Sequence, residues 1–358
     1  MRVLMAGGGT AGHTSPLLAT AAVLTESGDE ICCLGTTSGL EVTLIPQAGY
    51  RLEFVPRVPM PRRLSLDLLK LPFRLLATIR AARRVIDEFR PDVVVGFGGY
   101  VSVPAYIAAR RRSIPFVVHE GNALAGLANR LGARLTRFVA TSFPDTDLRH
   151  AQYLGLPIRQ DIADLDRHAN RTLAREFFGL APDAPTIVVT GGSQGARRLN
   201  TAMSDAAPAL AKAGIQVLHA AGRTNEVEVE SNPDENAPAY VVKEFIDRMD
   251  LAYAAGDLIV CRAGANTVTE VAAVGLPAVF VPLPIGNGEQ ALNADPVVAA
   301  GGGVLIDDAA FTSAWVENAL IPMVSDREQL DRMSSAASGV VHRDAAQRLA
   351  AMIHGAGE

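Results

Sequence analysis

The sequence has 358 residues, 49% of them hydrophobic and 20% charged, and a net charge of −5. This length suits two domains of ordinary size, and the negative net charge argues against a nucleic-acid-binding protein. The charge is unevenly distributed: residues 1–160 hold 19 basic and 12 acidic residues (+7), whereas residues 161–358 hold 14 and 26 (−12). We therefore expect the two halves to face different partners, the first half an anionic surface.

The cysteines and the start of the chain indicate a cytoplasmic protein. Cys32, Cys33 and Cys261 lie in apolar strand-like runs without metal-ligand spacing, which predicts buried thiols and no disulfides. The chain opens directly into a strand rather than a signal peptide. The uncharged run 93–109 contains glycines and a proline and is shorter than a membrane span, so we expect a strand, a loop and a helix there.

Strands and helices are expected to alternate through the first half. The expected strands are 1–6, 31–34, 51–55, 92–96, 116–118 and, as the last of this half, 138–141; the expected helices are 16–24, a long region ending at Phe89, and 103–111. Residues 153–166 are the expected linker. This order predicts an α/β fold with a parallel, doubly wound sheet.

The first glycine loop, GGGTAGH, directly follows the first strand. Gly7, Gly9 and Gly12 match the dinucleotide-binding fingerprint. That fingerprint also requires an acidic residue at the end of the second strand, where this chain has Gly35 and Thr36. A phosphate or ligand loop is therefore expected rather than a nicotinamide site.

Polar residues of the first-half loops are candidates for binding or catalysis. His13 falls in the first turn of a helix, where the dipole favours a neutral imidazole that could act as a base, or where it only fills the helix start. Asn122 in HEGNA is expected to cap the next helix and could contact a ligand. Arg159 in GLPIR could form a linker salt bridge or contact a phosphate.

The stretch 56–90 combines arginines with many leucines. A helical stripe is expected to face the core at Leu75, Ile79, Ala82, Ile86 and Phe89. This leaves several apolar residues without a core beside the basic side chains: Leu66, Leu68, Leu69, Leu71, Phe73 and Leu76. Such a patch predicts a membrane-docking surface. The alternative is a buried helix with a solvated basic face.

The second half repeats the same pattern. Strands are expected at 186–190, 215–219, 240–243 and 258–261, and the region 325–353 should be helical. GGSQGARRLN is a second anion loop, with Ser193 among its glycines. Phe245 and Ile246 could form a wall for a flat base. The residues 257–282 predict a strand, a loop, a helix from Thr267 and a strand; Glu270, three residues into that helix, could favour its dipole or bind sugar hydroxyls.

Seven blocks of this sequence resemble, in the same order, those of the MurG-type glycosyltransferases of bacterial peptidoglycan synthesis: GGGTAGH, GFGGYVS, HEGNA, GLPIR, GGSQGARRLN, EFIDRM and RAGANTVTE. The resemblance implies a GT-B fold with two Rossmann-like doubly wound parallel-sheet domains facing a cleft. Residues 1–158 would form an acceptor- and membrane-facing domain and residues 159–340 a UDP-N-acetylglucosamine-binding domain. A C-terminal helix in 341–358 would pack back toward the first domain.

The resemblance further implies an inverting transfer of N-acetylglucosamine from UDP-N-acetylglucosamine to lipid I, giving lipid II and UDP. His13 would be the general base. Glu270 would bind the ribose, the backbone at Ile246 the uracil, and Ser193 the diphosphate. The complete implied donor set is Thr10, Ala11, Gly12, Asn122, Arg159, Ser193, Ile246, Ala265, Asn266, Thr267, Val268, Thr269, Glu270 and Gln290. Gly9, Gly98, Gly99 and Tyr100 would form the acceptor-side loops.

No cofactor is implied, because UDP-N-acetylglucosamine is a substrate, and no metal-binding motif is present, although a divalent cation could assist. The implied partners are UDP-N-acetylglucosamine, lipid I, the anionic inner-membrane surface and other cell-wall synthesis and division proteins. The implied location is peripheral, on the cytoplasmic face of the cell membrane. Three residues depart from the family pattern within the implied site: Ala11, Gly121 and Glu289.

Three alternatives are compatible with parts of this pattern. A UDP-N-acetylglucosamine 2-epimerase would use two such domains and the same nucleotide sugar without a lipid. A nicotinamide oxidoreductase would use the first glycine loop. A non-catalytic, membrane-docked subunit would bind the nucleotide sugar without turnover.

Overall fold

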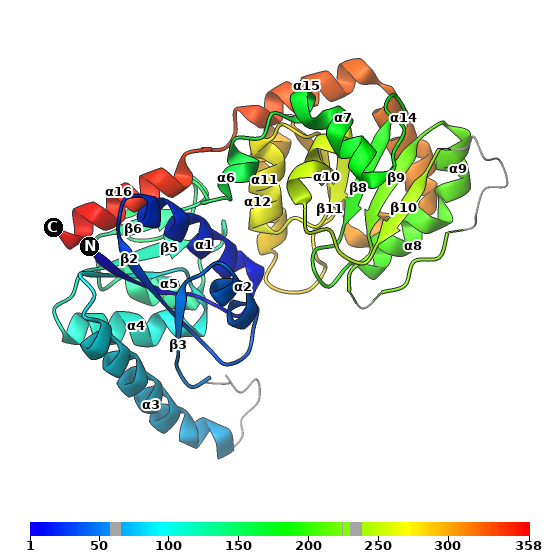
Figure 1. Cartoon of the computed structure of the whole chain (residues 1–358). Helices are drawn as coiled ribbons and strands as arrows, with labels where there is room; N and C mark the ends of the chain where they lie inside the picture. The colour runs from blue at the N-terminus through cyan, green and yellow to red at the C-terminus, as the bar shows by residue number, and fades with distance from the viewer. Residues whose placement is uncertain (58–65, 224, 230–237) are drawn as a thin grey trace. The chain divides into compact units, whose positions relative to one another are not determined.

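The computed structural model describes residues 1–57, 66–223, 225–229 and 238–358, and for residues 66–72 it describes the backbone alone. The chain divides into two compact units (Figure 1). Unit 1 comprises Met1–Arg159 and His342–Glu358, and unit 2 comprises Gln160–Val341. Each unit is built on a parallel sheet, which confirms the predicted α/β doubly wound class.

Within its described residues, unit 1 has a seven-stranded sheet in the order β3-β2-β1-β4-β5-β6-β7. The strands are β1 (Arg2–Ala6), β2 (Glu30–Gly35), β3 (Arg51–Phe54), β4 (Val93–Gly96), β5 (Phe116–Glu120), β6 (Val139–Thr141) and β7 (Ala151–Tyr153). The helices are α1 (Ala11–Glu26), α2 (Glu41–Gln47), α3 (Leu66–Phe89), α4 (Gly99–Arg111), α5 (Leu127–Ala133) and α16 (Ala345–Gly357). The expectation that 138–141 is the last strand was wrong, because the short edge strand β7 exposes most of its side chains and carries no apolar pattern.

Helices cover both faces of this sheet, so its strands are apolar on both sides. Successive side chains of β1 point to opposite faces. Val3 and Met5 pack with α1 and α16, whereas Leu4 and Ala6 pack with α3 and α4 (Figure 1). Two layers of helices therefore hold the carboxyl ends of the strands in place.

Within its described residues, unit 2 has a six-stranded parallel sheet in the order β10-β9-β8-β11-β12-β13. The strands are β8 (Thr186–Thr190), β9 (Gln216–Ala220), β10 (Tyr240–Lys243), β11 (Leu258–Cys261), β12 (Ala278–Phe280) and β13 (Gly303–Leu305). The helices are α6 (Gln160–Ala163), α7 (Arg167–Phe178), α8 (Arg197–Asp205), α9 (Ala207–Lys212), α10 (Met249–Ala255), α11 (Ala265–Ala273), α12 (Glu289–Ala299), η1 (Asp308–Ala310), α13 (Ser313–Trp315), the π-helical η2 (Val316–Leu320), α14 (Ile321–Ser325) and α15 (Arg327–Ser338).

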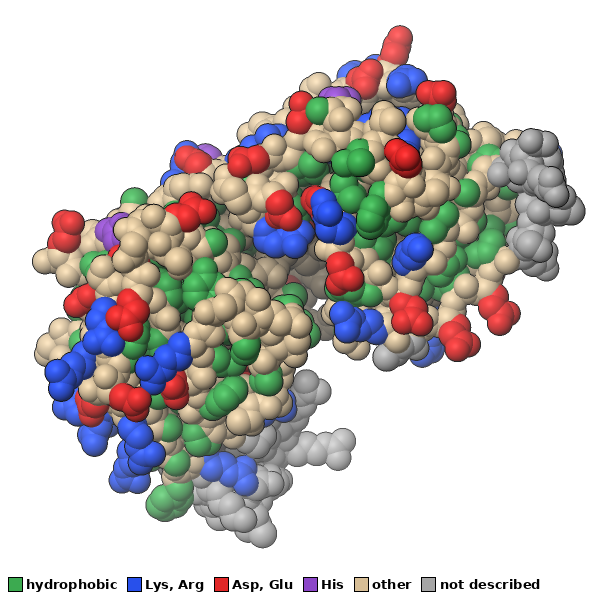
Figure 2. All heavy atoms as spheres, viewed as in Figure 1, with side chains coloured by type: hydrophobic (Ala, Val, Ile, Leu, Met, Phe, Trp, Pro, Cys, Tyr) green, Lys and Arg blue, Asp and Glu red, His purple; other side chains and the backbone are tan. Residues whose placement is uncertain are grey.

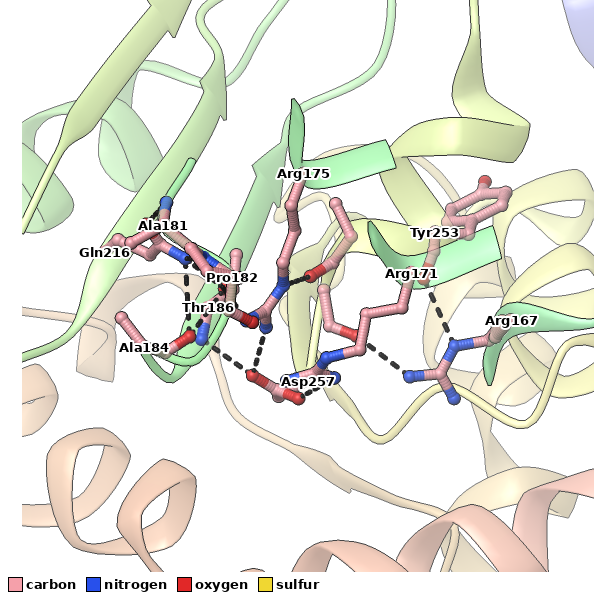
Figure 3. Close-up of polar contacts among 12 residues, drawn as sticks. Arg167, Arg171, Arg175, Ala181, Pro182, Ala184, Thr186, Gln216, Tyr253 and Asp257 are labelled. Carbon is pink, nitrogen blue, oxygen red and sulfur yellow. Dashed lines mark hydrogen bonds and ion pairs between the residues drawn. The ribbon is translucent and has the colours of Figure 1, made fainter. Parts of the chain in front are cut away.

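An ion-pair network fastens α7 to the amino end of β11 (Figure 3). The Asp257 carboxylate accepts hydrogen bonds from Arg175 Nη2 at 2.9 Å, from the Thr186 N–H at 2.8 Å and from Arg171 Nη1 at 2.5 Å. The Arg175 side chain is 1% exposed. A buried guanidinium is tolerated only where a counter-charge and hydrogen bonds satisfy it. This network lies at the ends of the strands opposite to the glycine loops.

The basic, leucine-rich stretch lies partly on α3. Ala82, Ile86 and Phe89 are buried as predicted, whereas Phe73 is 77% and Leu76 36% exposed. These two apolar side chains therefore have no core to face, and Lys and Arg side chains lie over this part of unit 1 (Figure 2). The side chains of Leu66, Leu68, Leu69 and Leu71 lie outside the described residues.

The strand order indicates which loops are expected to bind ligands. In unit 1 the order reverses between β1 and β4, and in unit 2 between β8 and β11. Ligands of open parallel sheets bind beyond the carboxyl ends of the strands at such a reversal. The four strands at the two reversals are those followed by GGGTAGH, GFGGYVS, GGSQGARRLN and RAGANTVTE.

Candidate active-site loops

His13 lies in the first turn of α1, which begins at Ala11 rather than at the predicted residue 16. Its imidazole is half-buried, and Nδ1 lies 3.0 Å from the carbonyl oxygen of Gly8. A carbonyl oxygen only accepts hydrogen bonds, so Nδ1 carries the proton in this contact, and in the neutral imidazole Nε2 is the nitrogen with the lone pair. The imidazole is therefore held in the form that can accept a proton at Nε2.

The loop after β4 packs against this imidazole. Gly98 and Gly99 have φ angles of 91° and 73°, a region that favours glycine. A Cβ atom on Gly98 would lie 3.1 Å from His13 Nε2, and one on Gly99 would lie 3.4 Å from Nδ1. The structure thus brings His13 together with two of the predicted acceptor-side residues. Tyr100, which follows them, is 58% exposed.

The HEGNA segment is organised by its acidic residue. Asn122 does not cap a helix, because α5 begins only at Leu127 with Gly126 as its cap residue. Instead the buried carboxylate of Glu120 accepts hydrogen bonds from the Asn122 N–H at 3.0 Å, the Gly126 N–H at 2.9 Å and the side-chain amide of Asn129 at 2.9 Å. The sequence signal for this role of Glu120 was its position, at the end of a buried strand and inside the HEGNA motif.

In unit 2, the loop after β8 surrounds Ser193 and leads to α8. Gly192 and Gly195 have positive φ angles of 82° and 71°. A Cβ atom on Gly195 would lie 2.0 Å from the carbonyl oxygen of Ala221, so the loops after β8 and β9 touch backbone to backbone. Ser193 is half-buried within this turn, where its side chain can approach an anion.

Glu270 is placed differently from the prediction. Because α11 begins at Ala265 rather than Thr267, Glu270 is its sixth residue and lies beyond the first turn. Its Oε2 instead accepts a hydrogen bond from the Tyr253 hydroxyl at 2.7 Å. The interpretation of Glu270 as an N-terminal dipole partner is therefore wrong. Within the predicted donor run, the side chains of Ala265, Val268 and Thr269 are buried.

Other predicted donor residues lie near loop ends of unit 2. Ile246 is buried, whereas the neighbouring Phe245 is 38% exposed and stacks beneath the Arg223 guanidinium at 4.4 Å. Glu289 and Gln290 are the first two residues of α12. The Gln290 Oε1 accepts a hydrogen bond from the Leu283 N–H at 2.9 Å, which closes the intervening loop.

Arg262 is a loop-organising residue that the sequence did not reveal. Its Nη1 donates to the carbonyl oxygens of Val281 at 3.1 Å and Pro282 at 3.0 Å and forms an ion pair with Asp308 at 2.6 Å. The loops after β11 and β12 are thereby tied together. The predicted Arg159 is exposed and is the last residue of unit 1 before α6.

The helices at the two reversals begin without side-chain caps. This holds for α1, α4, α8 and α11. Asp166 caps α7 and Asp326 caps α15, both away from the reversals, although other helices such as α9, α10 and α16 also begin without a side-chain cap. An uncapped helix N-terminus favours an anion such as a phosphate. In the part of the chain that the structure describes, no group of His, Cys, Asp and Glu side chains could hold a metal ion, and no helix is long and apolar enough to cross a membrane.

Comparison with known proteins assigns the chain to a family. The glycosyltransferase family 28 N-terminal domain matches residues 3–141, and the C-terminal domain of that family matches residues 186–349. A Nocardioides sp. protein is 62% identical over 355 residues, covering 99% of this chain and 97% of its own length. It is named UDP-N-acetylglucosamine--N-acetylmuramyl-(pentapeptide) pyrophosphoryl-undecaprenol N-acetylglucosamine transferase. The chain belongs to the MurG family. A Streptomyces avermitilis protein of the same name is 52% identical, over 99% of this chain and 98% of its own length.

Solved structures agree with this membership. The crystal structure of Acinetobacter baumannii MurG is 31% identical and has a TM-score of 0.78, covering 99% of both chains. The calicheamicin glycosyltransferase CalG4, at 17% identity and a TM-score of 0.69, shares the fold. This MurG-family chain is therefore a glycosyltransferase of GT-B fold, as the resemblance implied. The epimerase and binding-subunit alternatives are not favoured, and the oxidoreductase alternative is set aside.

Proposed function

We propose that this chain transfers N-acetylglucosamine from UDP-N-acetylglucosamine to lipid I, the undecaprenyl-pyrophosphoryl-N-acetylmuramoyl-pentapeptide, to form lipid II and UDP. The names of its MurG relatives support this choice of substrates. The observation that carries the catalytic part is the contact of His13 Nδ1 with the Gly8 carbonyl oxygen at 3.0 Å, which leaves Nε2 able to accept a proton. Unit 1 would bind the acceptor and unit 2 the nucleotide.

The proposed reaction is a direct displacement at the anomeric carbon. His13 Nε2 takes the proton of the acceptor hydroxyl while that oxygen forms the new bond to the anomeric carbon. The bond between this carbon and the diphosphate oxygen breaks on the opposite side, so UDP leaves with the bonding electrons and the configuration inverts. The leaving diphosphate gains negative charge, which the glycine loops and the uncapped N-termini of α8 and α11 stabilise.

Donor recognition follows from the loop positions in unit 2. Ser193 would bind the diphosphate, the backbone at Ile246 the uracil, and Glu270 the ribose hydroxyls. Tyr253, by donating to Glu270 Oε2 at 2.7 Å, would hold that carboxylate in place. The remaining proposed donor contacts are Thr10, Ala11, Gly12, Asn122, Arg159, Ala265, Asn266, Thr267, Val268, Thr269 and Gln290. Gly9, Gly98, Gly99 and Tyr100 would lie beside the lipid pyrophosphate.

A mass-spectrometric assay of the purified chain tests the reaction. The chain is incubated with UDP-N-acetylglucosamine, with and without a short-chain lipid I analogue. We expect UDP and one added N-acetylhexosamine on the lipid only when the acceptor is present. Epimerised donor without acceptor would support the epimerase instead, and tight UDP binding without turnover would support a binding subunit.

We further propose that α3 docks unit 1 on the anionic cytoplasmic face of the cell membrane. Exposed Phe73 and Leu76 would enter the interface, while Arg80, Arg83 and Arg84, all exposed, would meet the lipid phosphates. The +7 charge of residues 1–160 favours the same surface. Such a location would place the enzyme beside other cell-wall synthesis and division proteins.

Vesicle binding tests this docking surface. Replacing Phe73 and Leu76 by serine together with Arg80 and Arg84 by glutamine should reduce sedimentation with vesicles that contain anionic lipid. Phe177→Ser is the matched control, because Phe177 is 59% exposed on α7 in unit 2. Equal vesicle binding by the quadruple variant and the wild type would mean that α3 exposes these side chains to solvent alone.

A further inference from the structure

Glu41, the first residue of α2, is a fully buried acid to which neither the motifs nor the proposed reaction gives a role. Its Oε2 accepts a hydrogen bond from the Gly9 N–H at 2.7 Å, and its Oε1 accepts one from the Thr36 N–H at 3.2 Å. The Thr36 hydroxyl lies 2.8 Å from Oε1. Burying a carboxyl group is costly unless such hydrogen bonds compensate it. Both oxygens are therefore engaged by backbone donors.

The first glycine loop is shaped to admit this side chain. A Cβ atom on Gly8 would lie 2.5 Å from Glu41 Oε1, and one on Gly39 would lie 2.2 Å from Oε2. A Cβ atom at either position would push the Glu41 carboxylate out of this place, so the observed arrangement depends on glycine at both positions. Gly8 is also the glycine of GGGTAGH that the fingerprint spacing of Gly7, Gly9 and Gly12 does not use. The carboxylate thus accounts for a glycine that phosphate binding leaves unexplained.

One peptide group links Glu41 to His13. Glu41 accepts a hydrogen bond from the Gly9 N–H, and the Gly8 carbonyl oxygen accepts one from His13 Nδ1 at 3.0 Å. This N–H and this carbonyl belong to the same planar peptide group. In a trans peptide these two groups point in opposite directions, so fixing the N–H fixes the direction of the carbonyl. We propose that Glu41 is a positioning residue, which sets the tautomer and orientation of His13 through this peptide. The proposal rests on the proposed role of His13 as the base.

Glutamine cannot replace Glu41 in this arrangement. Its amide offers one oxygen and one NH2 group, whereas Glu41 faces a backbone N–H at each oxygen. In Glu41→Gln, an NH2 group would therefore meet either the Gly9 or the Thr36 N–H. Where the NH2 group meets the Gly9 N–H, the Gly8–Gly9 peptide would turn away from it and His13 Nδ1 would lose its aligned acceptor. Where it meets the Thr36 N–H, it can donate to the Thr36 hydroxyl oxygen and the peptide keeps its direction, so both arrangements of His13 are expected.

The test combines kinetics with the nitrogen NMR signals of the histidine rings. Protein labelled with 15N-histidine is compared as wild type, Glu41→Gln and Glu26→Gln, the last carrying the same substitution at an exposed acid in unit 1. The His13 signals are those that disappear in His13→Ala. We expect a protonated Nδ1 and a bare Nε2 in the wild type and in Glu26→Gln, and a mixture of tautomers in Glu41→Gln. The kcat of Glu41→Gln should fall by about 100-fold, as for a misplaced catalytic group, and more than its KM changes.

The outcomes separate the two proposals. A Glu41→Gln protein with a lower melting temperature but wild-type His13 signals and kcat would show that Glu41 only stabilises the fold. Altered His13 signals together with full activity of His13→Ala would uphold the positioning but refute the base role. Glu41→Ala removes both acceptor oxygens and with them the bond to the Gly9 N–H, so it should shift the His13 signals in the same direction. Unchanged His13 signals in a folded Glu41→Ala protein would overturn the positioning role.

Discussion

Tyr253 is not a proposed nucleotide contact, yet replacing it by phenylalanine should weaken nucleotide binding. The Tyr253 side chain is 1% exposed, and its hydroxyl donates to Glu270 Oε2 at 2.7 Å. Phenylalanine keeps the ring and removes the hydroxyl that makes this bond. Glu270 is half-buried, so water can partly replace the lost donor. The net loss should be about 1 kcal/mol, or about fivefold in the Kd for UDP.

Isothermal titration of the purified chain with UDP measures this loss, because it needs neither sugar transfer nor acceptor. Glu270→Ala should weaken UDP binding more, by about 1.5–3 kcal/mol, since it removes the proposed charged partner of the ribose. Tyr240→Phe is the matched control. Its hydroxyl also has a buried partner in unit 2, His219 Nδ1 at 2.9 Å, but lies in no proposed contact with the nucleotide.

The double variant decides how Tyr253 acts. If Tyr253 works only by holding Glu270, then Tyr253→Phe should have no further effect on UDP binding once Glu270 is alanine. Additive losses in the double variant would refute this reasoning, as would wild-type affinity in Tyr253→Phe. Losses of equal size in Tyr240→Phe would show that the effect comes from general destabilisation of unit 2.

Three further predictions concern catalysis, stability and pH. His13→Ala should retain UDP binding while kcat falls by about 100-fold or more, measured as lipid II formation; unchanged turnover would remove His13 from the base role. Asp257→Asn should lower the urea-unfolding free energy by about 3–5 kcal/mol, because it leaves the 1%-exposed Arg175 without its counter-charge. Arg171→Met, which loses only a partly exposed partner of the same carboxylate, should cost about 1 kcal/mol or less, and equal losses would contradict the argument. The hydrogen bonds from Arg248 lower the pKa of the Asp250 carboxyl below its ordinary 3.8, so its stabilising contribution is complete above pH 3.8 and is lost as the pH falls below it. The difference in unfolding free energy between wild type and Asp250→Asn should therefore shrink below about pH 4; a constant difference from pH 3 to pH 7 would exclude this linkage.

The strands were predictable because both faces of each parallel sheet are buried. The run 186–190 (TIVVT) is β-branched and buried at every position, so it stands out without any periodicity. Edge strands lack this signal: β7 exposes the side chains of Ala151 and Gln152 and half-exposes Tyr153, and no apolar run marks it. The sequence therefore predicted the central strands and the edge strands β3 and β10, but not the three-residue edge strands β7 and β13.

The starts of the site helices were predicted too late, and proline explains two of the errors. Pro16 and Pro104 would usually mark a first helical turn. Here α1 begins at Ala11 and α4 at Gly99, so both prolines lie inside their helices. Both helices in fact begin in glycine-rich segments, which have poor helix propensity and so gave no sign of a helix. Tertiary packing overrides that propensity here.

The glycine loops of the site were visible as motifs, whereas the residues that hold them were not. Glu41 is 32 residues from the Gly9 N–H that it accepts, and Arg262 is 20 residues from the Pro282 carbonyl oxygen. Each partner is a backbone group, which carries no side-chain signature in the sequence. The pairing exists only because the parallel sheet brings the carboxyl ends of its strands to one edge.

The uncapped N-termini of the helices at the strand-order reversals bear on the proposed function. A side-chain cap such as Asp166 on α7 satisfies the first N–H groups of a helix and stabilises it by about 1 kcal/mol. The helices α1, α4, α8 and α11 at the strand-order reversals forgo this stabilisation. A carboxylate cap at these positions would repel a diphosphate and occupy the donors that it needs. Glu41 and Glu120 in unit 1 and Arg262 in unit 2 hold the loops through backbone hydrogen bonds instead, so no carboxylate cap competes with the proposed diphosphate contacts at the helix N-termini. Rigidity and anion affinity are thus supplied by different residues, and substitutions of the two kinds should separate loss of turnover from loss of nucleotide binding.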